Sequence, residues 1–178
     1  MNQELNNLNR KVARYNEVLD NTHKYREVWI TELNQFILDQ LNYIMGEVGL
    51  DATVEVRADL ENLEAIELSL GTVRSGMSHR VNEHVQRDLI KHNGSLVYQQ
   101  LFNGKIMVLI QYPYIEGYGE PRPPKTIAIY RPEELKEPFF IRHIEEFIQE
   151  ITLWEDYDDD EPHQRIGFQL NFGTPAEE

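Results

Sequence analysis

The chain has 178 residues, of which 40% are hydrophobic and 10% aromatic, and it contains no cysteine. That apolar content suits one packed domain of ordinary size and excludes a chain that is disordered throughout. The formal net charge of −14, from 31 acidic and 17 basic side chains, opposes binding to nucleic acid and to anionic membrane surfaces, since both attract Lys and Arg.

Residues 2–47 contain no proline, and their apolar side chains recur in steps of three and four, which predicts a long helix. Up to residue 22 the stripe is narrow, as in a helix that packs against one partner. Between residues 28 and 45 the apolar residues occupy nearly the whole circumference of the predicted helix, which predicts burial on several sides. A bend or break is expected near residues 20–24, after Asp20-Asn21. The stripe consists of Leu5, Leu8, Val12, Tyr15, Leu19, Thr22, Arg26, Trp29, Leu33, Phe36, Gln40 and Tyr43.

Two short segments that follow show the period-two alternation of half-buried antiparallel strands. They are residues 54–57 and 66–70, joined by the polar link 59–64. Residues 79–92 fit two structures. Val81, Val85 and Leu89 favour a helix, and the same residues also suit a strand that ends in an Asn93-Gly94 turn.

Residues 95–112 predict a β-hairpin. Asn103-Gly104 supplies two residues that tolerate positive φ, which predicts a type I′ turn between the strands. Residues 106–110 are apolar without alternation, so that strand is expected in the middle of the sheet with both faces covered.

The stretch YPYIEGYGEPRPPKT, residues 112–126, connects two predicted strands and is longer than an ordinary hairpin loop. Its prolines predict a stiff polyproline segment, which includes the P-x-x-P pattern of residues 121–124. Tyrosine suits contacts at interfaces because it joins apolar area to a polar tip. The stretch is first a rigid strand connection and second a recognition surface. The candidate binding residues are Tyr112, Tyr114, Glu116, Tyr118, Glu120 and Arg122.

The C-terminal third begins with a strand at 126–130. A helix follows, with Pro138 in its first turn and an apolar stripe from Phe140 to Trp154, while Glu145, Glu146, Gln149 and Glu150 face away. We therefore expect an extended helical arm at 1–24, a single domain at 25–154, an acidic linker at 155–165, and a C-terminal strand and tail at 166–178.

No motif for catalysis or metal binding emerges. His84, Asp88 and His92 would lie near one face of a helix, but three successive turns are too far apart for one ion, and a strand would separate them further. No nucleophile, phosphate-loop or calcium-loop pattern is complete. The sequence therefore predicts no metal and no cofactor.

The predicted fold class is α+β, with a long N-terminal helix, an antiparallel sheet of about five to seven strands, a middle helix, and a C-terminal amphipathic helix covering the sheet. The order of helix, strands, helix, strands and helix, with the acidic charge, resembles the class I type III secretion chaperones. That resemblance implies a small acidic homodimer that holds other protein chains. The longer first helix and the strands at 126–130 and 166–172 depart from that family.

Three functions remain open. The first is a non-enzymatic, chaperone-like homodimer that assembles through the N-terminal helix or the C-terminal strand. The second is an enzyme or small-ligand binder with a site near the 112–126 loop, and the third is an adaptor that presents its proline-rich segment. The absence of cysteine and of any long apolar run predicts a cytoplasmic protein without a membrane span, and residues 1–17 predict no secretory signal.

Overall fold

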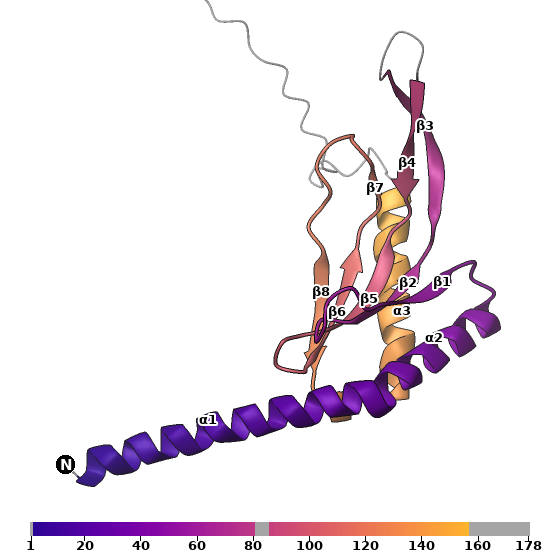
Figure 1. Ribbon diagram of the computed structural model, residues 1–178. Coiled ribbons are helices and arrows are strands. Elements are labelled where there is room, and N and C mark those ends of the chain that lie inside the picture. Colours follow the sequence, from indigo (N-terminus) through magenta and orange to yellow (C-terminus); the bar gives the residue numbers. More distant parts are fainter. Residues whose placement is uncertain (1, 81–85, 157–178) are drawn as a thin grey trace, which may run out of the picture.

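The computed structural model describes residues 2–80 and 86–156, and it confirms the α+β class (Figure 1). The helices are α1 (Asn2–Val28), a π-helix (Trp29–Leu33), α2 (Asn34–Val48), a short 3-10 turn (Pro132–Glu134) and α3 (Glu137–Glu155). The larger antiparallel sheet contains, in spatial order, β1 (Thr53–Arg57), β2 (Ala65–Ser69), β5 (Ser95–Gln100), β6 (Ile106–Gln111) and β8 (Lys125–Tyr130). The smaller antiparallel sheet contains β3 (Thr72–Arg80), β4 (Gln86–His92) and β7 (Tyr114–Ile115).

The N-terminal helix is continuous where a break was expected near residues 20–24, so that prediction is wrong. The irregularity lies further along, in the π-helix, where the Asn34 N–H bonds to the carbonyl of Trp29. From there the buried side chains follow steps of four: Trp29, Leu33, Ile37, Leu41 and Met45. The predicted burial on several sides is also wrong, because Ile30 and Tyr43 are 70% and 64% exposed. One face of this helix therefore enters the core.

The first part of α1 projects away from the rest of the molecule (Figure 1). We define the arm as residues 3–20, in which every side chain is exposed. The β5–β6 loop lies against the helix at Thr22, and the Arg26 guanidinium donates a hydrogen bond to the carbonyl of Phe102 in that loop.

The core lies between one face of the larger sheet and the helices α2 and α3. The predicted strand at residues 106–110 is central, since β6 pairs with β5 on one side and β8 on the other. Its alternate residues Ile106, Val108 and Ile110 are fully buried against the helices, and Leu109 is buried on the opposite face. The expected central strand with both faces covered is confirmed.

The predicted hairpin is confirmed, but its turn type is not. Gly104 has a φ of +74°, whereas Asn103 has no positive φ, and a type I′ turn requires both. The Gly104 N–H bonds to the Leu101 carbonyl at 2.8 Å, and the Leu101 N–H bonds to the Lys105 carbonyl. This pattern fits a type I turn followed by a glycine bulge, the usual form of a longer hairpin loop.

The predicted middle helix at 79–92 is wrong for the residues that the structure describes there. Residues 86–92 form β4, which pairs with β3 and β7, and Gly94 with a φ of +95° turns the chain into β5. The spacing of four between Val81, Val85 and Leu89 suits both structures, because residues four apart share one face of a helix and also one face of a strand. Pairing with distant strands decided between them, and residues 81–85 lie outside the described chain. The observed order is thus helix, strands and helix, which departs from the chaperone-like order.

Candidate functional site

The connection at 112–126 is long because part of it joins the smaller sheet. β7 pairs with the end of β4, placing Tyr114 opposite His92, and the Glu116 N–H bonds to the Ile90 carbonyl at 2.9 Å. Gly117, with a φ of +70°, then allows the chain to turn back. The excess length over an ordinary hairpin loop therefore has a structural reason.

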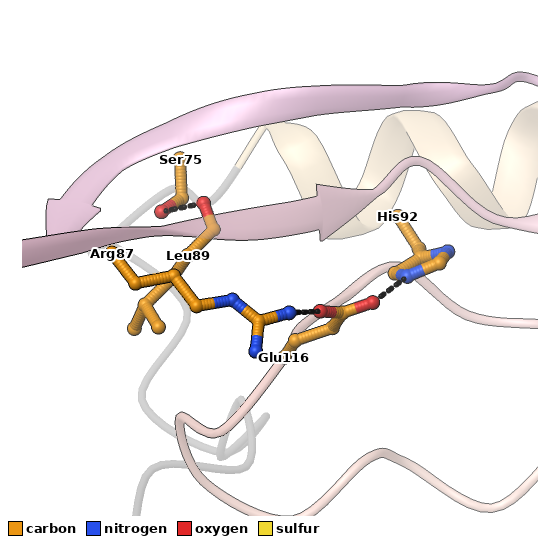
Figure 2. A network of polar contacts seen from close by, with 5 residues as sticks. All are labelled: Ser75, Arg87, Leu89, His92 and Glu116. Atoms are coloured by element: carbon orange, nitrogen blue, oxygen red, sulfur yellow. Dashed lines mark hydrogen bonds and ion pairs between the residues drawn. The ribbon is translucent and has the colours of Figure 1, made fainter. Parts of the chain in front are cut away.

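Glu116 is the polar centre of the first cluster in this region (Figure 2). One carboxylate oxygen lies 3.0 Å from Nε2 of His92, and the other lies 3.9 Å from the guanidinium of Arg87. The ring of His92 stacks on Tyr114 with centroids 4.4 Å apart and planes 4° from parallel. All of these side chains are at least partly exposed, so the ion pairs are screened by water and join the strands only weakly.

A second cluster holds the base of the connection against α3. The Tyr112 hydroxyl donates a hydrogen bond of 2.7 Å to Glu150, and the Lys125 ammonium lies 2.7 Å from Glu150 and 2.8 Å from Glu146. The hydrogen bond from Lys125 lowers the pKa of Glu150, and the bonds to both carboxylates raise the pKa of Lys125. Burial, followed by the bond to Glu150, raises the pKa of Tyr112. The guanidinium of Arg122 lies 3.9 Å above the Tyr112 ring.

Four of the six predicted binding residues belong to these clusters. Tyr112 is buried with Arg122 over its ring, whereas Tyr114 and Glu116 belong to the cluster around His92. Tyr118 is 40% exposed and Glu120 is exposed at the turn. An open depression of about 410 Å³ contains none of them; it is lined by Leu70, Ile148, Ile151, Thr152, Glu155 and Asp156.

Glu146 and Glu150 were expected to face solvent, yet they hold the connection on α3. Their spacing of four on a helix is a signal that they could bind one cation together, although it does not reveal that the cation is Lys125. The partners Arg87 and His92 were not assigned to Glu116 from the sequence either. Only strand pairing between β4 and β7 brings them together.

His143 is a buried polar group that sequence reasoning missed. It is 3% exposed, and it lies between two tyrosine hydroxyls, 3.1 Å from Tyr98 and 3.0 Å from Tyr130. Burial lowers the pKa of His143 to about 4 and raises the pKa of both tyrosines. A neutral imidazole donates from one nitrogen and accepts at the other, so the pair of hydroxyls satisfies it. This cluster joins α3 to the sheet inside the core and is closed to a substrate.

In residues 2–80 and 86–156 no group of three or more His, Asp or Glu side chains is arranged to hold a metal ion. Asp88 instead lies 3.5 Å from Arg74, His92 contacts Glu116, and His84 is outside the described residues. Across the same ranges, no helix has the length and apolar character needed to cross a bilayer.

The arm carries an exposed apolar stripe that contacts no other element in the described residues. Its side chains Leu5, Leu8, Val12, Tyr15, Val18 and Leu19 are between 42% and 63% exposed. The comparisons offer no relative to interpret it, since no protein-family model, no curated protein and no solved structure matches the chain.

Proposed function

We propose that the chain is a non-enzymatic protein-interaction protein that works as a homodimer joined through its N-terminal helices. The observation that carries this proposal is the exposed apolar stripe of the arm, at heptad spacing and without a partner in the described chain. A stripe of this kind, repeated every three and four residues, is what two helices need to pack side by side.

The sequence of the arm also gives little intrinsic stability to a helix that packs against nothing. Four of its residues are asparagine, which is a poor helix former, and its side-chain contacts are local, such as the exposed pair Arg14–Glu17. Most helical stability in proteins comes from the packing of an apolar face rather than from intrinsic propensity. A second helix would supply that packing.

Charge favours a second copy of this chain as the partner. The arm contains the acidic residues Glu4, Glu17 and Asp20 and the basic residues Arg10, Lys11 and Arg14, so it is formally neutral. The whole net charge of −14 therefore belongs to the rest of the chain. Two arms can approach each other without the repulsion that two acidic domains would meet.

The dimer is assigned to the cytoplasm, in keeping with the absence of cysteine. The order of elements departs from the chaperone family, so the proposal is limited to contact with other protein chains and does not include a chaperone's role. The predicted C-terminal strand at 166–178 is a further candidate contact and lies outside the described residues.

Sedimentation velocity over a range of concentrations tests the homodimer. The double variant Leu8→Glu with Val12→Glu should sediment as a monomer, because buried carboxylates would face each other between the helices. Asn6→Glu with Ala13→Glu adds the same charge on the outer face of the arm and should leave the dimer intact. A wild-type chain that remains monomeric at high concentration would contradict the proposal.

The proline-rich adaptor is the second candidate, and the exposure of residues 121–124 favours it. However, Arg122 lies on Tyr112 and Lys125 is bound to α3, so these basic side chains are already engaged within the chain. Replacing Pro121 and Pro124 by alanine should then leave the recovery of binding proteins unchanged. Loss of a specific partner on that replacement would favour the adaptor instead.

A further inference from the structure

We infer that the two arms pair antiparallel, so that Leu5 of each arm lies toward the β5–β6 loop of the other copy. This inference rests on the proposed homodimer and adds its direction and register. In the inferred register Leu8 of one copy lies opposite Val12 of the other, and Leu5 lies opposite Tyr15. Every side chain in these pairs is about half exposed in the single chain.

The first argument is that the β5–β6 loop already occupies one end of the apolar stripe. A Cβ atom on Gly104 would lie 2.6 Å from Cβ of Tyr25, 3.1 Å from the Thr22 carbonyl oxygen and 3.2 Å from the Arg26 nitrogen. The loop backbone therefore rests directly on the helix at Thr22 and Arg26, which continue the stripe beyond Leu19. A second helix can use the stripe only as far as Leu19.

This obstruction discriminates between the possible dimers. In a parallel pair, equivalent residues lie at the same level, so the two β5–β6 loops would meet on the same stretch of the stripe. In an antiparallel pair with Leu8 opposite Leu19, Leu5 would fall opposite Thr22, where the loop sits. With Leu8 opposite Val12, Leu5 falls opposite Tyr15, and both apolar pairs lie on the exposed part of the stripe, clear of the loop.

The charge distribution also favours the antiparallel pair over the parallel one. An antiparallel pair places the acidic domains at opposite ends of arms that are each about 27 Å long. That separation exceeds the screening length of about 8 Å at physiological ionic strength, so repulsion between the domains is weak. A parallel pair would hold the domains side by side. Phe102, which is 69% exposed at the tip of the loop, then offers apolar surface to the second helix.

Because the chain has no cysteine, single cysteines can report which residues face each other. A disulfide forms only when the two Cα atoms come within about 7 Å. Leu8→Cys alone should cross-link only in a parallel dimer. A mixture of Leu8→Cys and Val12→Cys should give the mixed disulfide in the inferred register, and a mixture of Leu8→Cys and Leu19→Cys reports the other antiparallel register. Asn6→Cys, on the outer face, measures random collision.

Mild oxidation followed by intact-mass analysis is expected to show the mixed Leu8–Val12 disulfide at several times the Asn6 background. Dominance of the Leu8–Leu8 or Leu8–Leu19 product, or no disulfide in a sample that sediments as a dimer, overturns the inference and leaves the homodimer standing. A sample that sediments only as a monomer contradicts both the inferred register and the homodimer.

The two Lys11 side chains also face each other in this register, so Lys11→Gln should tighten the dimer severalfold, whereas Arg10→Gln should not.

Discussion

The hydroxyl of Tyr112 donates a hydrogen bond of 2.7 Å to the carboxylate of Glu150, and this contact fastens the start of the long connection to α3. The same carboxylate accepts from Lys125 at the end of the connection. One side chain of α3 therefore holds both ends of a segment whose middle is exposed. The exposed middle part includes Pro121, Pro123 and Pro124.

Tyr112→Phe should lower the free energy of unfolding by about 1 kcal/mol, because it removes a partly buried hydrogen bond to a charged group. Urea denaturation followed by circular dichroism measures this. Tyr43→Phe is the matched control, since Tyr43 is 64% exposed, and it should change nothing measurable. Equal losses in both variants would show that the Tyr112 hydroxyl does not hold the connection.

The Lys125 ammonium, which lowers the pKa of Glu150 from its usual 4.5, predicts a pH dependence of stability. A carboxylate with a lowered pKa in the folded state stabilises the fold above pH 4.5, and the stabilisation is lost as the pH falls through the lower folded value. Glu150→Gln should be less stable than the wild type at pH 7. The difference should shrink below pH 4.5, as measured by thermal unfolding across that range. A difference that does not depend on pH would show that the ion pair with Lys125 adds nothing.

His143 predicts a separate loss of stability in weak acid. The unfolded chain protonates this imidazole near pH 6.5, whereas the folded chain resists protonation down to about pH 4, because the imidazole is buried between hydroxyls. The unfolded state therefore binds more protons between these values, and stability falls by about 3 kcal/mol as the pH drops from 6.5 to 4. Urea titrations at several pH values measure it.

His143→Gln is the comparison for that experiment, because glutamine can also donate and accept but does not titrate. Its unfolding free energy should vary less between pH 6.5 and 4 than that of the wild type. Parallel curves for the two proteins would rule out His143 as the group responsible.

Gly104→Ala should destabilise both the β5–β6 loop and the root of the arm. Its φ of +74° is unfavourable for alanine, and the new methyl would lie 2.6 Å from Tyr25 Cβ, so the helix or the loop must move. Gly71→Ala is a matched control with the same φ and no atom within 4 Å of the added methyl. We expect Gly71→Ala to cost about 1 kcal/mol from backbone strain and Gly104→Ala about 1–3 kcal/mol more. Similar melting temperatures for the two variants would mean that the loop does not press on the helix.

Local signals in the sequence predicted much of this fold. Asn103-Gly104 marked the hairpin because a turn with glycine between apolar runs depends on neighbouring residues alone. The turn type was wrong because Leu101 and Lys105 pair across the loop and lengthen it. Alternation likewise found β1 and β2, and the stripe from Phe140 onward found α3.

Pairings between distant residues could not be predicted in the same way. Strand β4 was taken for a helix because its apolar spacing suits both structures, and β7 was missed because a two-residue strand has no periodicity. Of the candidate binding surface, the sequence picked out Tyr112, Glu116 and Arg122 by their type. It could not show that Tyr112 binds Glu150 on α3 or that Glu116 binds His92 on β4, because contacts of that kind exist only after the chain has folded.

The π-helix at Trp29–Leu33 determines the direction in which the apolar stripe of the arm faces, relative to the buried face of α2. Its wider turn holds one more residue than an α-helical turn, and each residue of an α-helix advances the side-chain direction by about 100°. Deleting Ile30 to restore regular winding would leave Leu33 and the rest of α2 in the core and swing the stripe of Leu5, Leu8 and Val12 about a quarter-turn around the helix axis. The arm would still be a helix of the same composition, but its apolar stripe would face another direction relative to the domain.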